Sequence, residues 1–284
     1  MIIWISSYPK SGNTWVRSFI STLLFSKDGE ANLKNIKKTY QFPLRSHFKN
    51  ILDDFHSLKK ISENWIKSQE IINLDSKVRF LKTHHAFCNV NGNNFTNLQN
   101  TLGVIYIIRD PRNVITSILH HYSKKNYLEA KEFIFDEKRI IGITLEKKKN
   151  YKDNEFLTLI SSWKTHYNSW KKFPKNFYLI KYEDLLNNPE QEFEKLTNYL
   201  SKLLKLKFKK KVVSKAVETN SFENLKKLEE LDGFAEAAQN VITGNKNKFF
   251  NLGPENKWQN LLDTQTKNEI KLKFKKEMIE LKYL

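Results

Sequence analysis

The most informative part of this sequence is its beginning, Met1-Ile-Ile-Trp-Ile-Ser-Ser-Tyr-Pro-Lys-Ser-Gly-Asn-Thr-Trp-Val-Arg-Ser-Phe-Ile-Ser-Thr-Leu23. Its first five residues are apolar and rich in β-branched and aromatic side chains, and apolar positions at helical spacing follow the Tyr-Pro-Lys-Ser-Gly break. We therefore predict a strand, a tight loop and a helix. Such a junction offers backbone N–H groups and the positive end of a helix dipole, with Lys10, Ser11 and Thr14 beside it. The stretch predicts an anion-binding loop.

The size and composition of the chain indicate a globular protein. Its 284 residues, 39% of them apolar, can build one large α/β domain or two small ones. We find no internal repeat and no domain boundary, and we expect a single domain over residues 1–284. We also find no membrane span and no secretory leader, and the single Cys88 excludes an internal disulfide, so we expect a cytoplasmic protein.

The chain is strongly basic, with 49 Lys and Arg against 31 Asp and Glu and a net charge of +18. A positive field of this size attracts nucleic acid, anionic lipid, sulfated polymers or phosphorylated small molecules. Charge alone does not choose between them. Much of the excess is lysine in runs such as 147–149 and 209–211, which a general compositional bias would also produce.

Two further strand–loop–helix units follow the first. Residues 102–108 form a continuous apolar run, typical of a strand buried on both faces of a parallel sheet, and Pro111 suits the first turn of a helix that continues through His121. Residues 176–181 predict another strand, and 182–204 predict the helix after it. Three such units predict a three-layer α/β fold with a central, mostly parallel sheet and a ligand site at the carboxyl ends of the strands.

The other segments are predicted less sharply. We expect helices at 51–73 and 163–172, a short strand at 78–84, a loop-rich surface excursion at 26–50, a loop at 89–100, a mobile insertion or cap at 123–155, and a tail from Ser221 in which charged helix alternates with a loop at 249–258.

The first loop does not match the phosphate loop of nucleoside triphosphatases. That loop needs Gly-x-x-x-x-Gly-Lys-Ser/Thr, with the lysine after the second glycine. Here Lys10 precedes Gly12, which is the loop's only glycine. ATP or GTP hydrolysis is therefore a poor match, although a similar backbone geometry is expected.

Residues 8–15, Tyr-Pro-Lys-Ser-Gly-Asn-Thr-Trp, resemble the phosphosulfate loop of the cytosolic-type sulfotransferases, which use 3′-phosphoadenosine-5′-phosphosulfate (PAPS). Three more motifs of that family follow in its order: Lys82-Thr-His84, the run Ile105-Tyr-Ile-Ile-Arg-Asp-Pro-Arg-Asn-Val-Ile-Thr-Ser117, and Tyr182-Glu-Asp184. The resemblance spans residues 4–189.

The resemblance implies the catalytic residues. Lys10 would place a cation on the oxygen that bridges phosphate and sulfuryl group, where charge grows as the bond breaks. His84 would be the general base, a role that suits a histidine's ordinary pKa of about 6.5. His85 is adjacent, so the sequence leaves open which of the two acts. Lys82 would lie near the sulfuryl oxygens, and no metal is expected.

The resemblance also implies the residues that bind the donor. Arg109 offers a bidentate fork to the 3′-phosphate and Ser117 offers a hydroxyl. Trp15 and Phe222 would sandwich the adenine, and Tyr182 would hydrogen-bond to it. The 5′-phosphate would be held by the Thr14 hydroxyl and by the backbone N–H groups of Ser11, Gly12, Asn13 and Thr14.

The chain departs from the family pattern in its C-terminal loop. The family usually has Arg-Lys-Gly, a few residues and then Trp, whereas this chain has Asn251-Leu-Gly253 and Trp258. The two cations that close over the 3′-phosphate are therefore absent. Three lysines are candidates to replace them: Lys246, Lys248 and Lys257. A smaller departure is Asn13 in place of the usual Thr.

Other polar and aromatic residues have simpler interpretations. We expect Arg112 to be a solvated loop cation, with contact to the donor as the alternative, and Glu183 and Asp184 to cap a helix. Histidines on predicted helices are expected at surface or packing positions (His120, His121), and one helical face is expected to line the core or a pocket (Trp163, His166, Trp170).

These patterns together predict a PAPS-dependent sulfotransferase that transfers the sulfuryl group in line to a hydroxyl or amine of a small-molecule or saccharide acceptor and releases adenosine 3′,5′-bisphosphate. Two alternatives remain. One is a P-loop-like kinase that uses ATP, and the other is a non-catalytic basic protein that binds nucleic acid or another polyanion. The sequence predicts neither the acceptor nor the oligomeric state.

Overall fold

A computed structural model describes residues 1–55, 57–142, 156–237 and 248–284. The chain forms two compact units, each assembled from separate segments. Unit 1 consists of Met1–Tyr8, Thr39–Ile107 and Asp136–Leu179, and unit 2 consists of Pro9–Lys38, Ile108–Phe135 and Ile180–Leu284. The expectation of a single domain stays a prediction.

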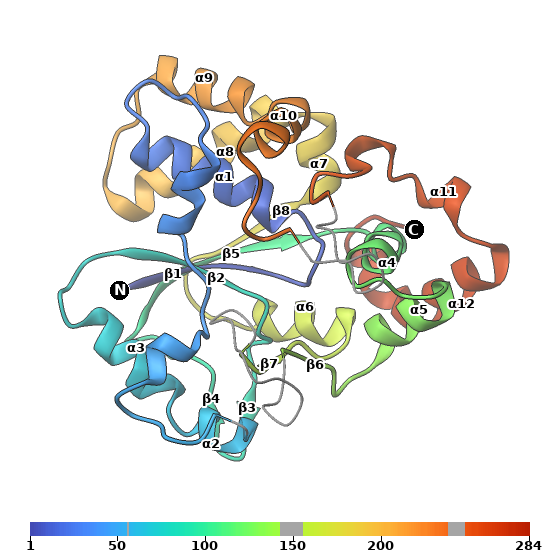
Figure 1. The fold of residues 1–284 in the computed structure, drawn as a ribbon, viewed down its shortest axis with the longest axis horizontal. Coiled ribbons are helices and arrows are strands. Elements are labelled where there is room, and N and C mark those ends of the chain that lie inside the picture. Colours follow the sequence, from blue (N-terminus) through green and yellow to red (C-terminus); the bar gives the residue numbers. More distant parts are fainter. Residues whose placement is uncertain (56, 143–155, 238–247) are drawn as a thin grey trace. The chain divides into compact units, whose positions relative to one another are not determined.

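A four-stranded sheet has the strand order β2-β1-β5-β8 (Figure 1). Its strands are β1 (Ile2–Ser7), β2 (Arg79–Thr83), β5 (Thr101–Ile108) and β8 (Phe177–Lys181). β1 pairs in parallel with β2 on one side and with β5 on the other, with Ser6 opposite Thr83 and Ser7 opposite Ile107. The predicted α/β class with a central parallel sheet is confirmed.

The core of unit 1 is built around Trp4. Its indole is fully buried, and its ring centroid lies 5.5 Å from that of Phe42, 5.4 Å from that of Phe95 and 6.3 Å from that of Trp170 on α6 (Trp163–Lys171). The indole Nε1 donates to Thr101 Oγ1 at 2.9 Å, so burial leaves no unpaired N–H. Trp163, His166 and Trp170 are also buried, as predicted for the inner face of this helix.

Two of the loop and helix predictions before β2 are wrong in part. Residues 51–55 and 57 are not helical, and the predicted helix at 51–73 is replaced by α2 (Leu58–Ser62) and α3 (Trp65–Asn73), because Ser57 caps α2 by accepting from Lys60 N. The segment 26–50 is not purely a surface excursion. It contains 3₁₀ helices at Leu33–Lys38 and Arg45–Phe48, and aromatic anchors such as Phe42 are fully buried.

Two short antiparallel strand pairs also belong to unit 1. β3 (Asn89–Val90) and β4 (Asn93–Asn94) pair across Asn91 and Gly92, whose φ angles of 50° and 89° are those a two-residue hairpin turn requires. This hairpin lies where the sequence predicted a loop. β6 (Ile140–Ile141) pairs with β7 (Thr158–Leu159).

In unit 2, α1 (Asn13–Phe25) follows β1 directly, as predicted. The ring of its Phe19 stacks on Phe193 of α8 (Pro189–Leu204) with centroids 4.0 Å apart. The helix predicted over 182–204 is divided into α7 (Tyr182–Asn187) and α8, because Asn188 precedes a proline and leaves the helical conformation.

Three other helices of unit 2 pack together: α4 (Pro111–His121), α5 (Tyr127–Phe135) and α12 (Thr264–Glu280) (Figure 1). α4 has the predicted bounds. α5 buries Ala130, Phe133 and Ile134, so this part of the predicted mobile cap is an integral helix. Residues 143–155 of that prediction lie outside the described residues.

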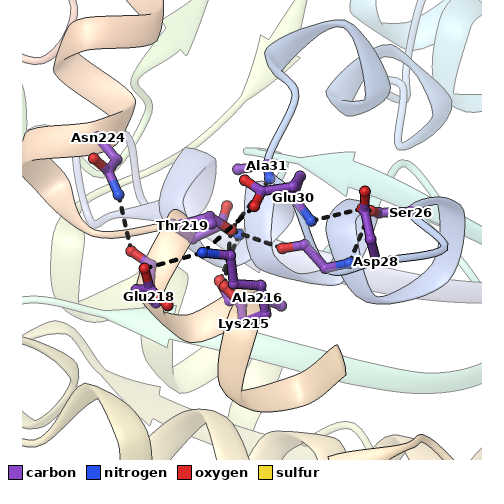
Figure 2. Close-up of polar contacts among 11 residues, drawn as sticks. Ser26, Asp28, Glu30, Ala31, Lys215, Ala216, Glu218, Thr219 and Asn224 are labelled. Atoms are coloured by element: carbon purple, nitrogen blue, oxygen red, sulfur yellow. Dashed lines mark hydrogen bonds and ion pairs between the residues drawn. The ribbon is translucent and has the colours of Figure 1, made fainter. Parts of the chain in front are cut away.

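The end of α9 (Lys210–Thr219) is tied to the segment after α1 (Figure 2). Thr219 Oγ1 donates to the carbonyl of Gly29 at 2.7 Å and accepts from the N–H of Ala31 at 3.2 Å. Lys215 lies 3.4 Å from a carboxylate oxygen of Glu30. These contacts fix the point from which α10 (Phe222–Asp232) begins.

The chain ends with a 3₁₀ turn at Gly253–Glu255, then α11 (Trp258–Leu261) and α12. In the described ranges no helix is long and apolar enough to cross a bilayer.

Candidate active site

The loop between β1 and α1 has the backbone geometry of an anion cradle. Lys10 and Gly12 both have positive φ, 68° and 94°, and α1 begins at Asn13. The first N–H groups of an α-helix have no carbonyl partner within the helix. Ser11 is fully buried, and its Oγ has no hydrogen-bond partner among the described residues. Gly12 is required here, because a Cβ would lie 2.5 Å from the ring of Tyr182.

Arg109 joins this loop to the end of β5. Because β1 and β5 are parallel neighbours, the residues that follow the two strands meet. Arg109 Nη1 donates to the carbonyl of Lys10 at 3.1 Å and to Ser117 Oγ on α4 at 3.2 Å. Arg109 and Ser117, which are eight residues apart in the sequence, are therefore in direct contact at the start of α4.

An aromatic wall flanks Arg109. The guanidinium carbon lies 4.1 Å from the ring centroid of Tyr182, and Trp15 meets that ring edge-on at 5.9 Å. Trp15 Nε1 donates to the carbonyl of Asn220 at 2.7 Å. Trp15 and Phe222 pack against one apolar cluster (Leu33, Ile36, Leu225, Phe234, Phe250).

Phe222 and Gly253 are in direct contact. A Cβ at Gly253 would lie 2.3 Å from the Phe222 ring, and Gly253 has a φ of 50°. All of the predicted donor-binding residues thus lie in unit 2, where they form two groups. One group surrounds the loop of residues 10–15, and the other is the pair Phe222 and Gly253.

The lysines considered as replacements for the missing Arg-Lys pair face carboxylates. Lys248 Nζ lies 3.2 Å from Glu230, and Lys257 Nζ lies 3.5 Å from Glu255. Lys246 is outside the described residues. The side chain that does reach Ser117 from this segment is Asn256, with Nδ2 at 2.9 Å from the hydroxyl. No sequence motif marked Asn256.

Lys10 has an aromatic neighbour from the C-terminal segment. Its ammonium lies 4.4 Å from the ring centroid of Phe249, a cation–π contact.

His84 follows β2 in unit 1, and its tautomer is fixed by the backbone. His84 Nδ1 lies 2.8 Å from the carbonyl of Ser7, which can only accept, so the proton is on Nδ1 and the lone pair of the neutral ring is on Nε2. The fully buried His166 holds the backbone at this point, because its Nε2 donates to the His84 carbonyl at 3.1 Å. Burial lowers the pKa of His166 to about 3.

His85 has the opposite surroundings. Its ring is fully buried and stacks on Phe95 with centroids 4.3 Å apart, and its Nδ1 lies 2.8 Å from the carbonyl of Ala86. Burial lowers its pKa to about 4. Lys82, two residues before His84 and on β2, is 8% exposed.

Two predictions about charged residues are wrong. Arg112 is not a solvated cation. It is 9% exposed, pairs with Asp110 at 2.7 Å and stacks on Trp258 at 3.8 Å. Asp110 caps α4 by accepting from the backbone N–H of Arg112, and it also pairs with the Arg112 guanidinium. The sequence Asp-Pro-Arg could have indicated this cap.

Glu183 does not cap its own helix, since α7 has no side-chain cap. It accepts instead from Asp110 N at 2.9 Å and from the Tyr283 hydroxyl at 2.8 Å. Burial raises the pKa of Glu183.

The fold and this loop together define an α/β protein with an anion-binding strand–loop–helix. A family model described as "Sulfotransferase domain" matches residues 2–282. The chain therefore belongs to the sulfotransferase family, and it is an enzyme of that class.

Individual relatives are distant. The chain is 25% identical over 283 residues to sulfotransferase 1B1 of Canis lupus familiaris, covering 97% of this chain and 83% of that protein. It is 25% identical over 235 residues to cytosolic sulfotransferase 7 of Arabidopsis thaliana, covering 80% of this chain and 64% of that protein. Its fold is similar to that of mouse sulfotransferase SULT7A1 complexed with PAP, with a TM-score of 0.61, 20% identity, and coverage of 98% of this chain and 83% of that one.

Proposed function

We propose that this sulfotransferase takes its sulfuryl group from PAPS and passes it to a hydroxyl or amine acceptor, releasing adenosine 3′,5′-bisphosphate. The observation that carries the proposal is the pair of bonds from Arg109 to the Lys10 carbonyl and to Ser117. These bonds hold the loop that begins at Lys10 beside Arg109 and Ser117, so two groups of hydrogen-bond donors for anions lie next to each other. A nucleotide with charged groups at both its 5′ and 3′ ends fits this arrangement, whereas ATP carries its phosphates at one end only.

The 5′ end of the donor would lie against the first loop. The buried Ser11 hydroxyl, which has no partner among the described residues, and the first N–H groups of α1 suit a phosphate oxygen. Thr14, which is 5% exposed, would add its hydroxyl. Gly12 and Asn13 would contribute through their backbone.

The adenine would lie among Trp15, Phe222 and Tyr182, with Gly253 beneath Phe222. Support comes from the shared apolar cluster of Trp15 and Phe222 and from the close approach of Phe222 to Gly253. The named donor-binding residues all belong to unit 2, so donor binding is proposed as a property of that unit.

Lys10 would stabilise the oxygen that leaves the sulfur, where negative charge develops in the transition state. The cation–π contact with Phe249 is worth about 0.5–2 kcal/mol. A doubly charged phosphosulfate attracts the ammonium more strongly, so donor binding is expected to draw Lys10 from the ring.

His84 would remove the acceptor's proton. The bond from Nδ1 to Ser7 leaves the lone pair on Nε2, the nitrogen that would accept that proton. The burial of His85 disfavours it as the base. Lys82 would stabilise the sulfuryl oxygens, the transfer would be direct and in line, and no metal is assigned a role.

Calorimetric titration with adenosine 3′,5′-bisphosphate tests the donor. Wild-type protein should bind saturably, and Arg109→Ala should weaken binding. Lys10→Ala and His84→Ala should retain binding and lose turnover, since they act mainly on the transition state. If wild-type protein does not bind adenosine 3′,5′-bisphosphate at millimolar concentration, the proposal is wrong.

The two alternatives have distinct signatures. Magnesium-dependent ATP turnover without binding of adenosine 3′,5′-bisphosphate would favour a kinase. Strong, salt-sensitive oligonucleotide binding without nucleotide binding would favour a polyanion-binding protein. Labelled donor offered with phenols, alcohols, amines and saccharides would identify the acceptor class. The cytoplasmic location stays a prediction, supported by the relative named as cytosolic.

A further inference from the structure

Asn256 is a buried amide that ties the C-terminal segment to α4. It is 5% exposed. Its Nδ2 donates to the carbonyl of Asn113 at 3.1 Å and to Ser117 Oγ at 2.9 Å, and its Oδ1 accepts from Thr116 Oγ1 at 2.6 Å. All four residues belong to unit 2.

The orientation of this amide is fixed by chemistry. A backbone carbonyl can only accept, so the atom that faces Asn113 O must be the NH₂ group and not the oxygen. The same NH₂ group faces Ser117. Asn256 therefore gives a proton to the Ser117 hydroxyl and cannot take one from it.

Ser117 Oγ then receives two hydrogen bonds, one from Asn256 Nδ2 and one from Arg109 Nη1. Neither nitrogen can accept, and a hydroxyl has two lone pairs and one proton. Both lone pairs are occupied, so the hydroxyl can act only as a donor to any third group. Among the described residues no acceptor is recorded for that proton.

We propose that Asn256 is a positioning residue that makes Ser117 a dedicated donor to the phosphate monoester on the 3′ position of the donor nucleotide. The proposal rests on the proposed function. It assigns the task of completing the 3′-phosphate site to a neutral amide in the segment that lacks the family's Arg-Lys pair.

The test compares two nucleotides that differ in one group. Calorimetry measures the Kd of adenosine 3′,5′-bisphosphate and of adenosine 5′-monophosphate for wild type and for Asn256→Ala. In Asn256→Ala the Ser117 hydroxyl is no longer held as a donor to the 3′-phosphate. The Kd of the bisphosphate should therefore rise by about 10-fold or more, because hydrogen bonds to charged groups are worth about 1.5–3 kcal/mol. The Kd of the monophosphate should change by less than about 2-fold, since it makes no use of this site.

Two further variants separate positioning from structure. Asn256→Asp keeps the side-chain shape and the acceptor for Thr116 but gives Ser117 a carboxylate as acceptor, so it should weaken the bisphosphate more than Asn256→Ala does. Asn260→Asp makes the same charge change at an exposed position of α11 and should leave both nucleotides unaffected. Because Asn256→Asp also sets a carboxylate oxygen against the Asn113 carbonyl, unchanged affinity for the monophosphate is needed to show that the variant is folded before its affinity for the bisphosphate is compared.

A double-mutant cycle with Ser117→Ala tests whether Asn256 influences nucleotide affinity through Ser117. If Asn256 acts through Ser117, adding Asn256→Ala to Ser117→Ala should cause no further loss. Additive losses, equal losses for both nucleotides, or unchanged bisphosphate affinity in the Asn256 variants would overturn this inference alone. Failure of the wild type to bind the bisphosphate would overturn the proposed function as well.

Discussion

At the scale of single residues, neighbouring identical side chains have different chemistry because of what surrounds them. His84 is half-buried, and its Nδ1 is hydrogen-bonded to the carbonyl of Ser7 on the neighbouring strand β1. His85 is fully buried against Phe95. Consecutive residues at the end of a strand point to opposite sides. His84 therefore keeps an exposed part, as its proposed role as the base requires, whereas His85 is part of the core.

Replacement of His84 by Asn should lower kcat by about 10²–10⁴-fold, the usual contribution of a general base, and leave the Kd of adenosine 3′,5′-bisphosphate nearly unchanged. Steady-state turnover of labelled donor and calorimetry measure the two effects. His120→Asn, at an exposed position of α4, is the matched control and should retain wild-type kcat. Wild-type turnover by His84→Asn would remove His84 from the mechanism.

Replacement of Gly253 by Ala should displace the Phe222 ring, since the new Cβ would lie 2.3 Å from it. We expect the Kd of adenosine 3′,5′-bisphosphate to rise by about 10-fold, corresponding to about 1.4 kcal/mol of lost contact. Gly92→Ala is the control, because Gly92 also has positive φ, 89°, but among the described residues nothing lies within 4 Å of the added methyl group. Equal nucleotide affinity in the two variants would contradict the assignment of Phe222 to the adenine site.

At the scale of elements, the site depends on how helix ends are held. Trp15 donates to the carbonyl of Asn220, and Asn220 Nδ2 donates to Thr22 on α1 at 3.1 Å. The segment between α9 and α10 is in turn anchored by Thr219 to residues 29–31 (Figure 2). This polar clamp fixes α1 and the start of α10, which carry Trp15 and Phe222.

Replacement of Thr219 by Val should destabilise the protein by about 1–3 kcal/mol, because the buried Gly29 carbonyl and Ala31 N–H lose their shared partner. Urea unfolding measures the change. Thr197→Val is the matched control: it is similarly buried, but among the described residues its hydroxyl bonds only to the Phe193 carbonyl of its own helix. A similar small loss in both variants would show that the clamp contributes little.

At the scale of the whole molecule, two buried histidines couple stability to pH. Burial lowers the pKa of His85 to about 4 and that of His166 to about 3. In the unfolded chain both return to about 6.5. Between about pH 6.5 and about pH 4 the unfolded state therefore binds more protons than the folded state, so stability falls as pH falls through that window.

The free energy of unfolding should be lower at about pH 5 than at about pH 7.5, by about 2 kcal/mol for each of the two histidines. Urea titrations at the two pH values measure the difference. In His85→Phe, which keeps an aromatic ring in the same stack, the pH-dependent loss should be about half as large. An unchanged pH dependence in this variant would show that His85 does not titrate between the two states.

Much of this molecule follows from local sequence. The strands β1 and β5 and the helix α4 were predicted within a few residues, because continuous apolar runs, a glycine break and Pro111 act locally. Segments whose apolar residues lacked a clear period were predicted poorly. Phe42 and the helix at Tyr127–Phe135 are buried by partners distant in sequence, which no local pattern reveals.

The family, the parallel sheet and the order of the motifs can be inferred from the order of residues alone, because residue spacing in a strand–loop–helix is a local property. The side chains that surround the anion-binding loop are instead selected by the folded structure. It paired Arg109 with the Lys10 carbonyl, placed His85 in the core, and turned Lys248 and Lys257 toward glutamates. It also brought Asn256 to Ser117 across 139 residues of chain. Contacts of this kind depend on packing between distant segments, and no spacing in the chain encodes them.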